Sequence, residues 1–320
     1  PGLALATLLL CPALLINSDL RPDNFSLLFF NLTLLFLEAH RLGKVRLSPK
    51  WLFAVALLYA LWANLHLGLL FGLLLIGFYA ITEALQALLP LISVKRRMGS
   101  LRGFGRYALV ASAATLGTFF NPYALDLYGV LREHQRTMDF LQDLILEWQI
   151  PELSNGLLWP FWILLLCTFA STLWHYLKTK KTPLALVFPF LYFGLMASRH
   201  VRHVAYSVLI SLPLFYFTVS RLTRASRWIV LVGLISACLL IVHISLTGRF
   251  LRSTSESFLN EDGSQLVDFL MKESSAIGSK KIYIRWHLGG YLGFRTAYPV
   301  FFDGRYIFHD LLAQTHESFL

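Results

Sequence analysis

The chain has 320 residues, of which 56% are hydrophobic and 14% are charged, and its formal net charge is +10. Soluble domains hold about 25% charged residues, so this composition excludes an ordinary soluble protein and indicates a membrane protein. A net charge of this size is typical of nucleic-acid binding in soluble proteins. Here orientation in a membrane explains most of it, and no nucleic-acid partner is expected.

Long apolar runs recur along the chain and predict an all-α polytopic membrane protein with about nine transmembrane helices. A hydrocarbon core of about 30 Å needs about 20 apolar residues per helix. The predicted spans are 2–17, 25–39, 51–63, 67–91, 104–120, 158–176, 183–198, 204–219 and 228–247. Several are short for a full crossing, so we expect tilting, re-entry or a misplaced boundary in some of them.

Basic residues are concentrated in every second gap between these runs. Four gaps contain fifteen basic residues and no acidic residue: 40–50, 92–106, 178–182 and 220–227. The four alternate gaps contain five basic and eight acidic residues: 18–24, 62–66, 121–157 and 198–203. Because Lys and Arg mark cytoplasmic loops, we predict that residue 1 starts inside and that the alternate gaps lie outside.

The first two outside gaps carry polar groups at the membrane face. Arg21 in the first gap is expected either to bind a phosphate of a lipid or substrate or to snorkel to the interface. Asn64 and His66 in the second gap are strong hydrogen-bonding groups that need partners at this boundary, in either a structural or a functional role. Gly68 and Gly72 follow them at a spacing that allows close helix approach.

The third outside gap, 121–157, is the longest, and Glu147 lies near its end. The pattern over 131–146 predicts an amphipathic helix on the outer membrane surface. Asp139 and Asp143 stand four residues apart on this helix. They are predicted to face solvent, with a metal-binding role as the alternative.

The fourth outside gap contains Arg199, His200, Arg202 and His203 within six residues. Outside turns tend to avoid basic residues, so this turn departs from the charge pattern of the rest of the chain. Guanidinium groups bind phosphate well. The turn is therefore the strongest candidate for holding a polyanion such as a lipid phosphate or a pyrophosphate.

The composition changes after Gly248, where eight basic and eight acidic residues follow. This change divides the chain into a transmembrane domain, 1–247, and the start of a small extracytoplasmic α/β domain, 248–320. The predicted elements of the second domain are an amphipathic helix over 260–272, with Leu266, Phe269 and Leu270 on one face, and strands over 281–285 and 298–302.

No motif for a cofactor or a metal occurs in the chain, and the need for a divalent metal stays open. Cys11, Cys167 and Cys238 all fall inside apolar runs, so they are interpreted as small core residues and not as a disulfide or a metal site. The chain opens at Pro1 and stops at Leu320 soon after a polar motif. We therefore expect a piece that is truncated at both ends.

Taken in order, the polar motifs resemble those of a family of bacterial membrane proteins related to the GT-C glycosyltransferases, of the mannosyl- and arabinosyltransferase type. The motifs that carry the resemblance are Arg21-Pro22, Trp62-Ala63-Asn64-Leu65-His66, Asn121-Pro122-Tyr123, Glu147-Trp148 with Pro151, the turn 199–203, and Gly289-Gly290-Tyr291-Leu292 with Phe302-Asp303-Gly304-Arg305. They extend over nearly the whole chain, and their order makes the match more specific than any one of them.

The resemblance implies a transferase that moves a hexose or pentose from a polyprenyl-phosphate carrier to an acceptor at the outer face. It implies that the carrier phosphate is bound by Arg21, Arg199 and Arg202. It also implies an outward cavity lined by Asn64, His66 and Glu147. The general base of the family is an acidic residue in the first outside loop, expected upstream of residue 1, so no catalytic residue is assigned and Asp19 and Asp23 do not take that role.

Two alternatives stay open beside the transferase. A transporter or lipid flippase needs polar groups at mid-membrane depth and an inverted repeat, and the sequence offers only Glu83 as an acid inside a span and away from its end. A non-catalytic scaffold would bind a partner through its outside domain. In every case we expect a multi-pass protein of the bacterial inner membrane, surrounded by lipids and with an oligomeric state that the sequence does not predict.

Overall fold

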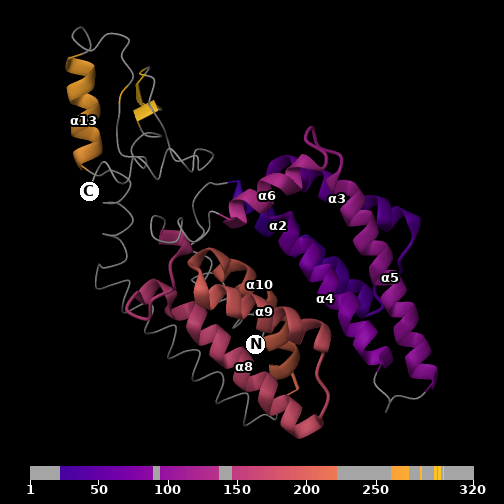
Figure 1. Cartoon of the computed structure of the whole chain (residues 1–320). Helices are drawn as coiled ribbons and strands as arrows, with labels where there is room; N and C mark the ends of the chain where they lie inside the picture. Colours follow the sequence, from indigo (N-terminus) through magenta and orange to yellow (C-terminus); the bar gives the residue numbers. More distant parts are fainter. Residues whose placement is uncertain are drawn as a thin grey trace. The chain divides into compact units, whose positions relative to one another are not determined.

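A computed structural model describes residues 22–88, 94–136, 146–221 and 261–273, with 282, 292–293, 295–296 and 298. The chain divides into two compact units, Pro1–Val242 and His243–Leu320, and each is described by itself. The described part is mostly helical (Figure 1).

The first unit contains eight described α-helices joined mainly by short connections. They are α2 (Asp23–Arg41), α3 (Pro49–Leu65), α4 (Leu69–Leu88), α5 (Val94–Thr118), α6 (Asp126–Arg136), α8 (Trp159–Thr179), α9 (Leu184–Arg199) and α10 (Val204–Val219). Three short 3₁₀ helices lie between them: η2 (Leu146–Trp148), η3 (Gly156–Leu158) and η4 (Val201–His203). Proline stands in the first turn of α3 and α8, where its missing N–H has no intrahelical acceptor.

Seven of the predicted spans coincide with the helices α2 to α5 and α8 to α10, while 2–17 and 228–247 lie outside the described residues. Three helical segments are long and apolar enough to cross a membrane: Leu69–Leu88, Trp159–Thr179 and Val201–Val219. Two further apolar helices, α3 and α9, are shorter. By length and composition these helices confirm the predicted membrane protein. The nine-helix topology stays a prediction.

Two helices begin earlier than predicted. The helix α5 begins at Val94, in the basic gap before the predicted span, because Lys and Arg are good helix formers. The helix α6 begins at Asp126, before the predicted surface helix 131–146. Residues 137–145, which include Asp139 and Asp143, lie outside the described residues.

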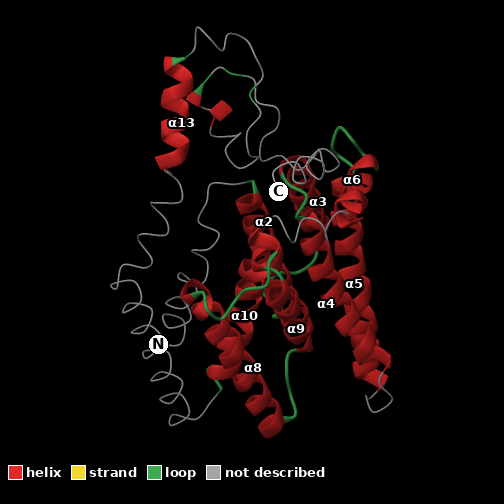
Figure 2. Cartoon of the chain, turned by 60° about the vertical axis from the view of Figure 1, so that its left-hand side comes forward, coloured by secondary structure: helices red, strands yellow, loops and turns green. Residues whose placement is uncertain are grey.

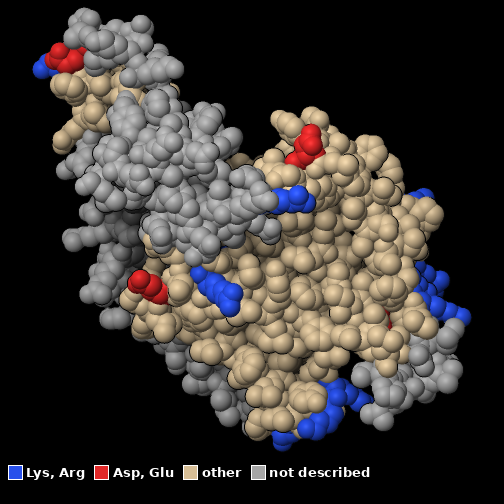
Figure 3. All heavy atoms as spheres, in the orientation of Figure 1, with Lys and Arg blue, Asp and Glu red and all other residues tan. Residues whose placement is uncertain are grey.

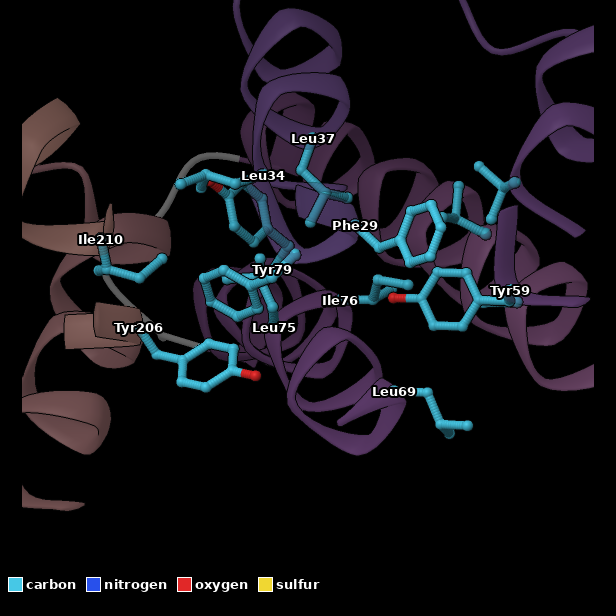
Figure 4. Close-up of a cluster of buried hydrophobic side chains, with 14 of the residues drawn as sticks. Phe29, Leu34, Leu37, Tyr59, Leu69, Leu75, Ile76, Tyr79, Tyr206 and Ile210 are labelled. Carbon is cyan, nitrogen blue, oxygen red and sulfur yellow. The ribbon is translucent and has the colours of Figure 1, made fainter. Parts of the chain in front are cut away.

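One buried cluster joins α2, α3, α4, α5, α9 and α10. Figure 4 shows its centre, where side chains of α4 such as Leu75 and Tyr79 meet those of α2 and α10. A second cluster joins α8 to α10 through residues such as Phe161 and Phe215. In Figures 1 and 2, α8 and α10 lie on one side of α2, and α5 lies on its other side.

Glycines allow two of these helix contacts to be close. A Cβ at Gly117 of α5 would meet the backbone of Ala56 in α3. A Cβ at Gly72 of α4 would meet the side chains of Tyr59 and Trp62 in α3. Small residues at such crossings let helix backbones approach, as expected from the sequence at Gly72.

The C-terminal end of α2 is linked to α4 by the side chain of Glu38. Glu38 accepts hydrogen bonds from Nε and Nη2 of Arg41, both 2.7 Å, and from the hydroxyl of Tyr79, also 2.7 Å. On the face shown in Figure 3, Lys and Arg side chains gather along the lower and right-hand edges, near the start of α5 and the connection from α8 to α9. Both segments belong to the basic gaps.

The second unit contains the predicted amphipathic helix, α13 (Glu261–Lys272). Val267 and Leu270 are buried against Leu292, with Leu266 partly buried beside them. The prediction was wrong for Phe269, which is 58% exposed, because Val267 points to the core in its place.

The predicted strands of the second unit fall mostly outside the described residues. Ile282 forms a single bridge position, and Tyr298 packs against the small core of α13. The described residues contain no extended strand. The α/β character of this unit, and its two late motifs, therefore stay predictions.

Candidate functional site

Polar side chains from separate segments of the first unit meet at one end of the helices, at the start of α2 and α10 and the end of α3. We call this set the polar cluster. It comprises Asp23, Ser26, Trp62, His66, Trp148, His200, Arg202, His203 and Tyr206.

The centre of the polar cluster is a hydrogen-bonded row between α2 and α3. The indole Nε1–H of Trp62 donates to Oγ of Ser26 at 2.7 Å, and this Oγ lies 2.7 Å from Nδ1 of His66. The backbone N–H of Gly68 donates to the same Nδ1 at 3.1 Å. Gly68 has no room for a side chain, since a Cβ there would meet Oγ of Ser26. The row therefore depends both on Trp62, which precedes His66 in the chain, and on Gly68, which follows it.

Asp23 lies in the first turn of α2, where a carboxylate is stabilised by the helix dipole. Its Oδ1 is 3.6 Å from Nδ1 of His66 and 3.4 Å from the hydroxyl of Tyr206, which donates to it. The carboxylate thus lies between α3 and α10 and is 14% exposed.

His66 is held neutral at pH 7. Burial lowers the pKa of His66 below its ordinary value of 6.5, and the positive charge of Arg202 lowers it further, while Asp23 acts in the opposite direction. The first cause dominates because the imidazolium loses water when it is buried. The influence of Arg202 shows that the two predicted residues belong to one electrostatic site.

The other side of the polar cluster is built where η2 and η4 meet. The N–H of Val201 donates to the carbonyl oxygen of Gln149 at 3.1 Å. Nδ1 of His200 lies 2.7 Å from the carbonyl oxygen of Trp148 and must donate, because a carbonyl only accepts. The guanidinium of Arg202 stands over the indole of Trp148, 5.2 Å from the ring centroid, at cation–π distance.

His203 is buried among aromatic rings, with 2% of its surface exposed. Its ring centroid is 5.2 Å from that of Phe71, 5.9 Å from that of Trp148 and 5.7 Å from that of His200. In the described part of the chain neither ring nitrogen has a hydrogen-bond partner. Buried polar groups are normally bonded, so His203 holds unused hydrogen-bonding capacity inside the polar cluster.

The structure brings together only some of the predicted site residues. His66 and Arg202 belong to the polar cluster, whereas Arg199 is exposed at the end of α9. Asn64 donates to the carbonyl oxygens of Ala60 and Phe120, both at 2.7 Å, and so links the end of α3 to the segment after α5.

The two other predicted site residues are less closely defined. Glu147 lies in η2, next to Trp148 of the polar cluster. Arg21 lies outside the described residues.

Other members of the polar cluster had no site role in the sequence-based prediction. Asp23 and Ser26 stand three residues apart at the start of an apolar run, which could have indicated one polar helix face. Tyr206 gave no such signal, because it begins an apolar helix like any interfacial tyrosine. Among the described residues no group of three or more His, Cys, Asp or Glu side chains is placed to hold a metal ion.

Comparisons with known proteins give no match among family models, curated proteins or solved structures.

Proposed function

We propose that this protein is an integral membrane glycosyltransferase of the GT-C type, which transfers a sugar from a polyprenyl-phosphate carrier to an acceptor, and that the carrier phosphate binds at Arg202. The proposal extends the resemblance of the sequence motifs. It includes a multi-pass location in the bacterial inner membrane, with the polar cluster and the second unit on the outer side, as the alternation of basic gaps predicts.

The environment of Arg202 is the observation that supports the phosphate site. The guanidinium carbon of Arg202 lies over the indole of Trp148, 5.2 Å from the ring centroid, and Arg202 forms no ion pair within the described residues. A guanidinium held in this way keeps its N–H edge for bidentate hydrogen bonds to a phosphate. Partial burial strengthens such bonds because water competes less.

The position of the polar cluster favours a transferase over a transporter. The cluster lies at helix ends, where a lipid headgroup would lie, and not at mid-helix depth as a transport site would. Glu83, the acid that the transporter alternative needs, packs against α5, since a Cβ at Gly103 would lie 2.8 Å from its carboxyl carbon. Glu83 is therefore partly buried between α4 and α5, near the end opposite the polar cluster.

The proposal is tested by replacing the two arginines of the fourth gap separately in protein reconstituted into lipid nanodiscs. We expect Arg202→Gln to weaken the binding of a polyprenyl phosphate about tenfold to a hundredfold. This loss corresponds to the free energy of a hydrogen bond to a charged group. Arg199→Gln is the matched control and should change the affinity by about twofold or less, as for an exposed charge.

Two results would contradict the proposal. Equal affinities of Arg202→Gln and the unmodified protein would exclude Arg202 as the phosphate ligand. Equal binding of the polyprenol that lacks the phosphate would show that the site recognises only the lipid chain. If binding follows the expectation, release of sugar from the polyprenyl-phosphate donor by the protein, and its loss in Arg202→Gln, tests the transferase activity itself.

A further inference from the structure

His66 stands beside an aspartate, an arrangement that often identifies a general base. In a base of that kind the carboxylate accepts a hydrogen bond from one ring nitrogen, and the other nitrogen presents a free lone pair to the substrate. The surroundings of His66 do not fit this pattern. Its Nδ1 is 3.6 Å from Oδ1 of Asp23, which is too long for a hydrogen bond.

The neighbours of Nδ1 determine which nitrogen of His66 carries the proton. The backbone N–H of Gly68 can only donate, and it points at Nδ1 from 3.1 Å. Nδ1 must therefore accept, so it carries no hydrogen in the neutral ring. A neutral imidazole has one N–H, and this leaves the proton on Nε2.

The contacts of Ser26 are consistent with the same assignment. Its Oγ already accepts the indole N–H of Trp62, a group that can only donate. The hydroxyl hydrogen of Ser26 is then available for Nδ1 of His66, 2.7 Å away. Nδ1 is thus capped by two donors, and His66 has no free lone pair with which to take a proton from a substrate.

We propose that His66 serves the polar cluster as a neutral Nε2–H hydrogen-bond donor to a phosphate oxygen of the ligand held at Arg202, and not as a general base. The role of the phosphate rests on the proposed function, while the assignment of the proton does not. Because Nδ1 is occupied, Nε2 is the nitrogen left to meet a ligand, and 20% of the side chain is exposed. In the described residues Nε2 has no hydrogen-bond partner.

A neutral donor suits this position for an electrostatic reason. Burial disfavours a positive charge on His66, and the charge of Arg202 acts in the same direction, while Asp23 acts in the opposite one. An imidazolium would also lose the hydrogen bond from the N–H of Gly68, since a protonated Nδ1 would face that donor. Donation from a neutral ring avoids both costs and still adds a hydrogen bond to the phosphate.

The proton assignment is tested without any ligand. In protein with ¹⁵N-labelled histidine in lipid nanodiscs, the signals of His66 are identified by their loss in His66→Gln. We expect Nδ1 to show the shift of an unprotonated ring nitrogen and Nε2 that of a protonated one at pH 7. A protonated Nδ1 would overturn the inference whatever the protein binds.

The donor role is tested by two substitutions that preserve different nitrogens. The amide of His66→Gln reaches the place of Nε2, whereas the shorter His66→Asn reaches only the place of Nδ1. We expect the affinity for a polyprenyl phosphate to stay within about threefold in His66→Gln and to fall about tenfold or more in His66→Asn. Equal affinities of the two variants would overturn the donor role.

Arg202→Gln separates this inference from the proposed function. A weakened His66→Asn beside an unchanged Arg202→Gln would reject the phosphate site at Arg202 and keep the donor at His66. A weakened Arg202→Gln beside equal His66 variants would do the reverse. Elution of each variant as a single species in size-exclusion chromatography confirms that it is folded.

Discussion

Replacing Gly117 with alanine should separate α3 from α5 and destabilise the first unit. The added Cβ would meet the carbonyl oxygen of Ala56 and would stand 3.0 Å from its carbonyl carbon and 3.1 Å from its Cα. Ordinary van der Waals contacts of a Cβ begin near 3.4 Å. The atoms it meets are backbone, so no side-chain rotation can make room for it.

The size of the effect follows from the movement that the helices must make. Contacts between carbon and a carbonyl oxygen are comfortable at about 3.3 Å, so α3 and α5 must move apart by about 1 Å here. Overpacking of this kind costs about 1–3 kcal/mol. Helix association in membranes depends on close van der Waals packing, so the loss extends along the whole contact.

Thermal unfolding of purified protein in detergent, followed by intrinsic tryptophan fluorescence, measures this effect. We expect the midpoint to fall by about 2–4 °C for each kcal/mol. Gly105→Ala is the matched control on the same helix, where a Cβ meets nothing within 4 Å. It should leave the midpoint unchanged or raise it, because alanine favours helix by about 1 kcal/mol. Equal midpoints of the two variants would refute the reasoning from backbone contact.

Three further outcomes follow from the side chains described above. His203→Phe should raise the unfolding midpoint, since it replaces an imidazole without described partners by an apolar ring, a gain of about 1 kcal/mol; a lower midpoint would contradict this. The free energy of unfolding should fall as the pH drops below 6.5, because His66 binds a proton at a higher pH in the unfolded chain than in the folded protein. In denaturation experiments at several pH values, His66→Gln should reduce the slope of the unfolding free energy against pH. Glu38→Gln should lower the free energy of unfolding by about 1–3 kcal/mol by weakening its bonds to Arg41 and Tyr79, yet leave polyprenyl-phosphate affinity unchanged, because it lies at the other end of α2; reduced affinity would show that the two ends are coupled.

The positions of the helices could be predicted because they depend on local composition. An apolar run long enough to bury itself in lipid must be helical, since every backbone group needs a partner within its own segment. The predicted spans therefore coincide with α2 to α5 and α8 to α10. The early start of α5 was missed because hydropathy reports where a helix is apolar and not where it begins.

The composition of the polar cluster could be predicted only in part. The charge pattern singled out Arg202 and Arg199 together, and the sequence alone treats them alike. The structure separates them, because Arg199 ends α9 in an exposed position while Arg202 belongs to η4 and meets Trp148. Asn64 and His66 were also paired by sequence, yet one links α3 to Phe120 and the other meets Ser26.

By itself the sequence determined that this is an apolar, helical membrane chain with polar groups gathered in alternate gaps, because lipid solvation acts on each segment separately. Only the tertiary structure decided which of those groups meet. Ser26 belongs to α2, whereas Trp62 and His66 lie at the end of α3, and their row exists because α2 and α3 meet where Gly68 leaves room. The N–H of Gly68 reaches Nδ1 of His66 locally, but the hydroxyl of Ser26 reaches it only through that contact between α2 and α3.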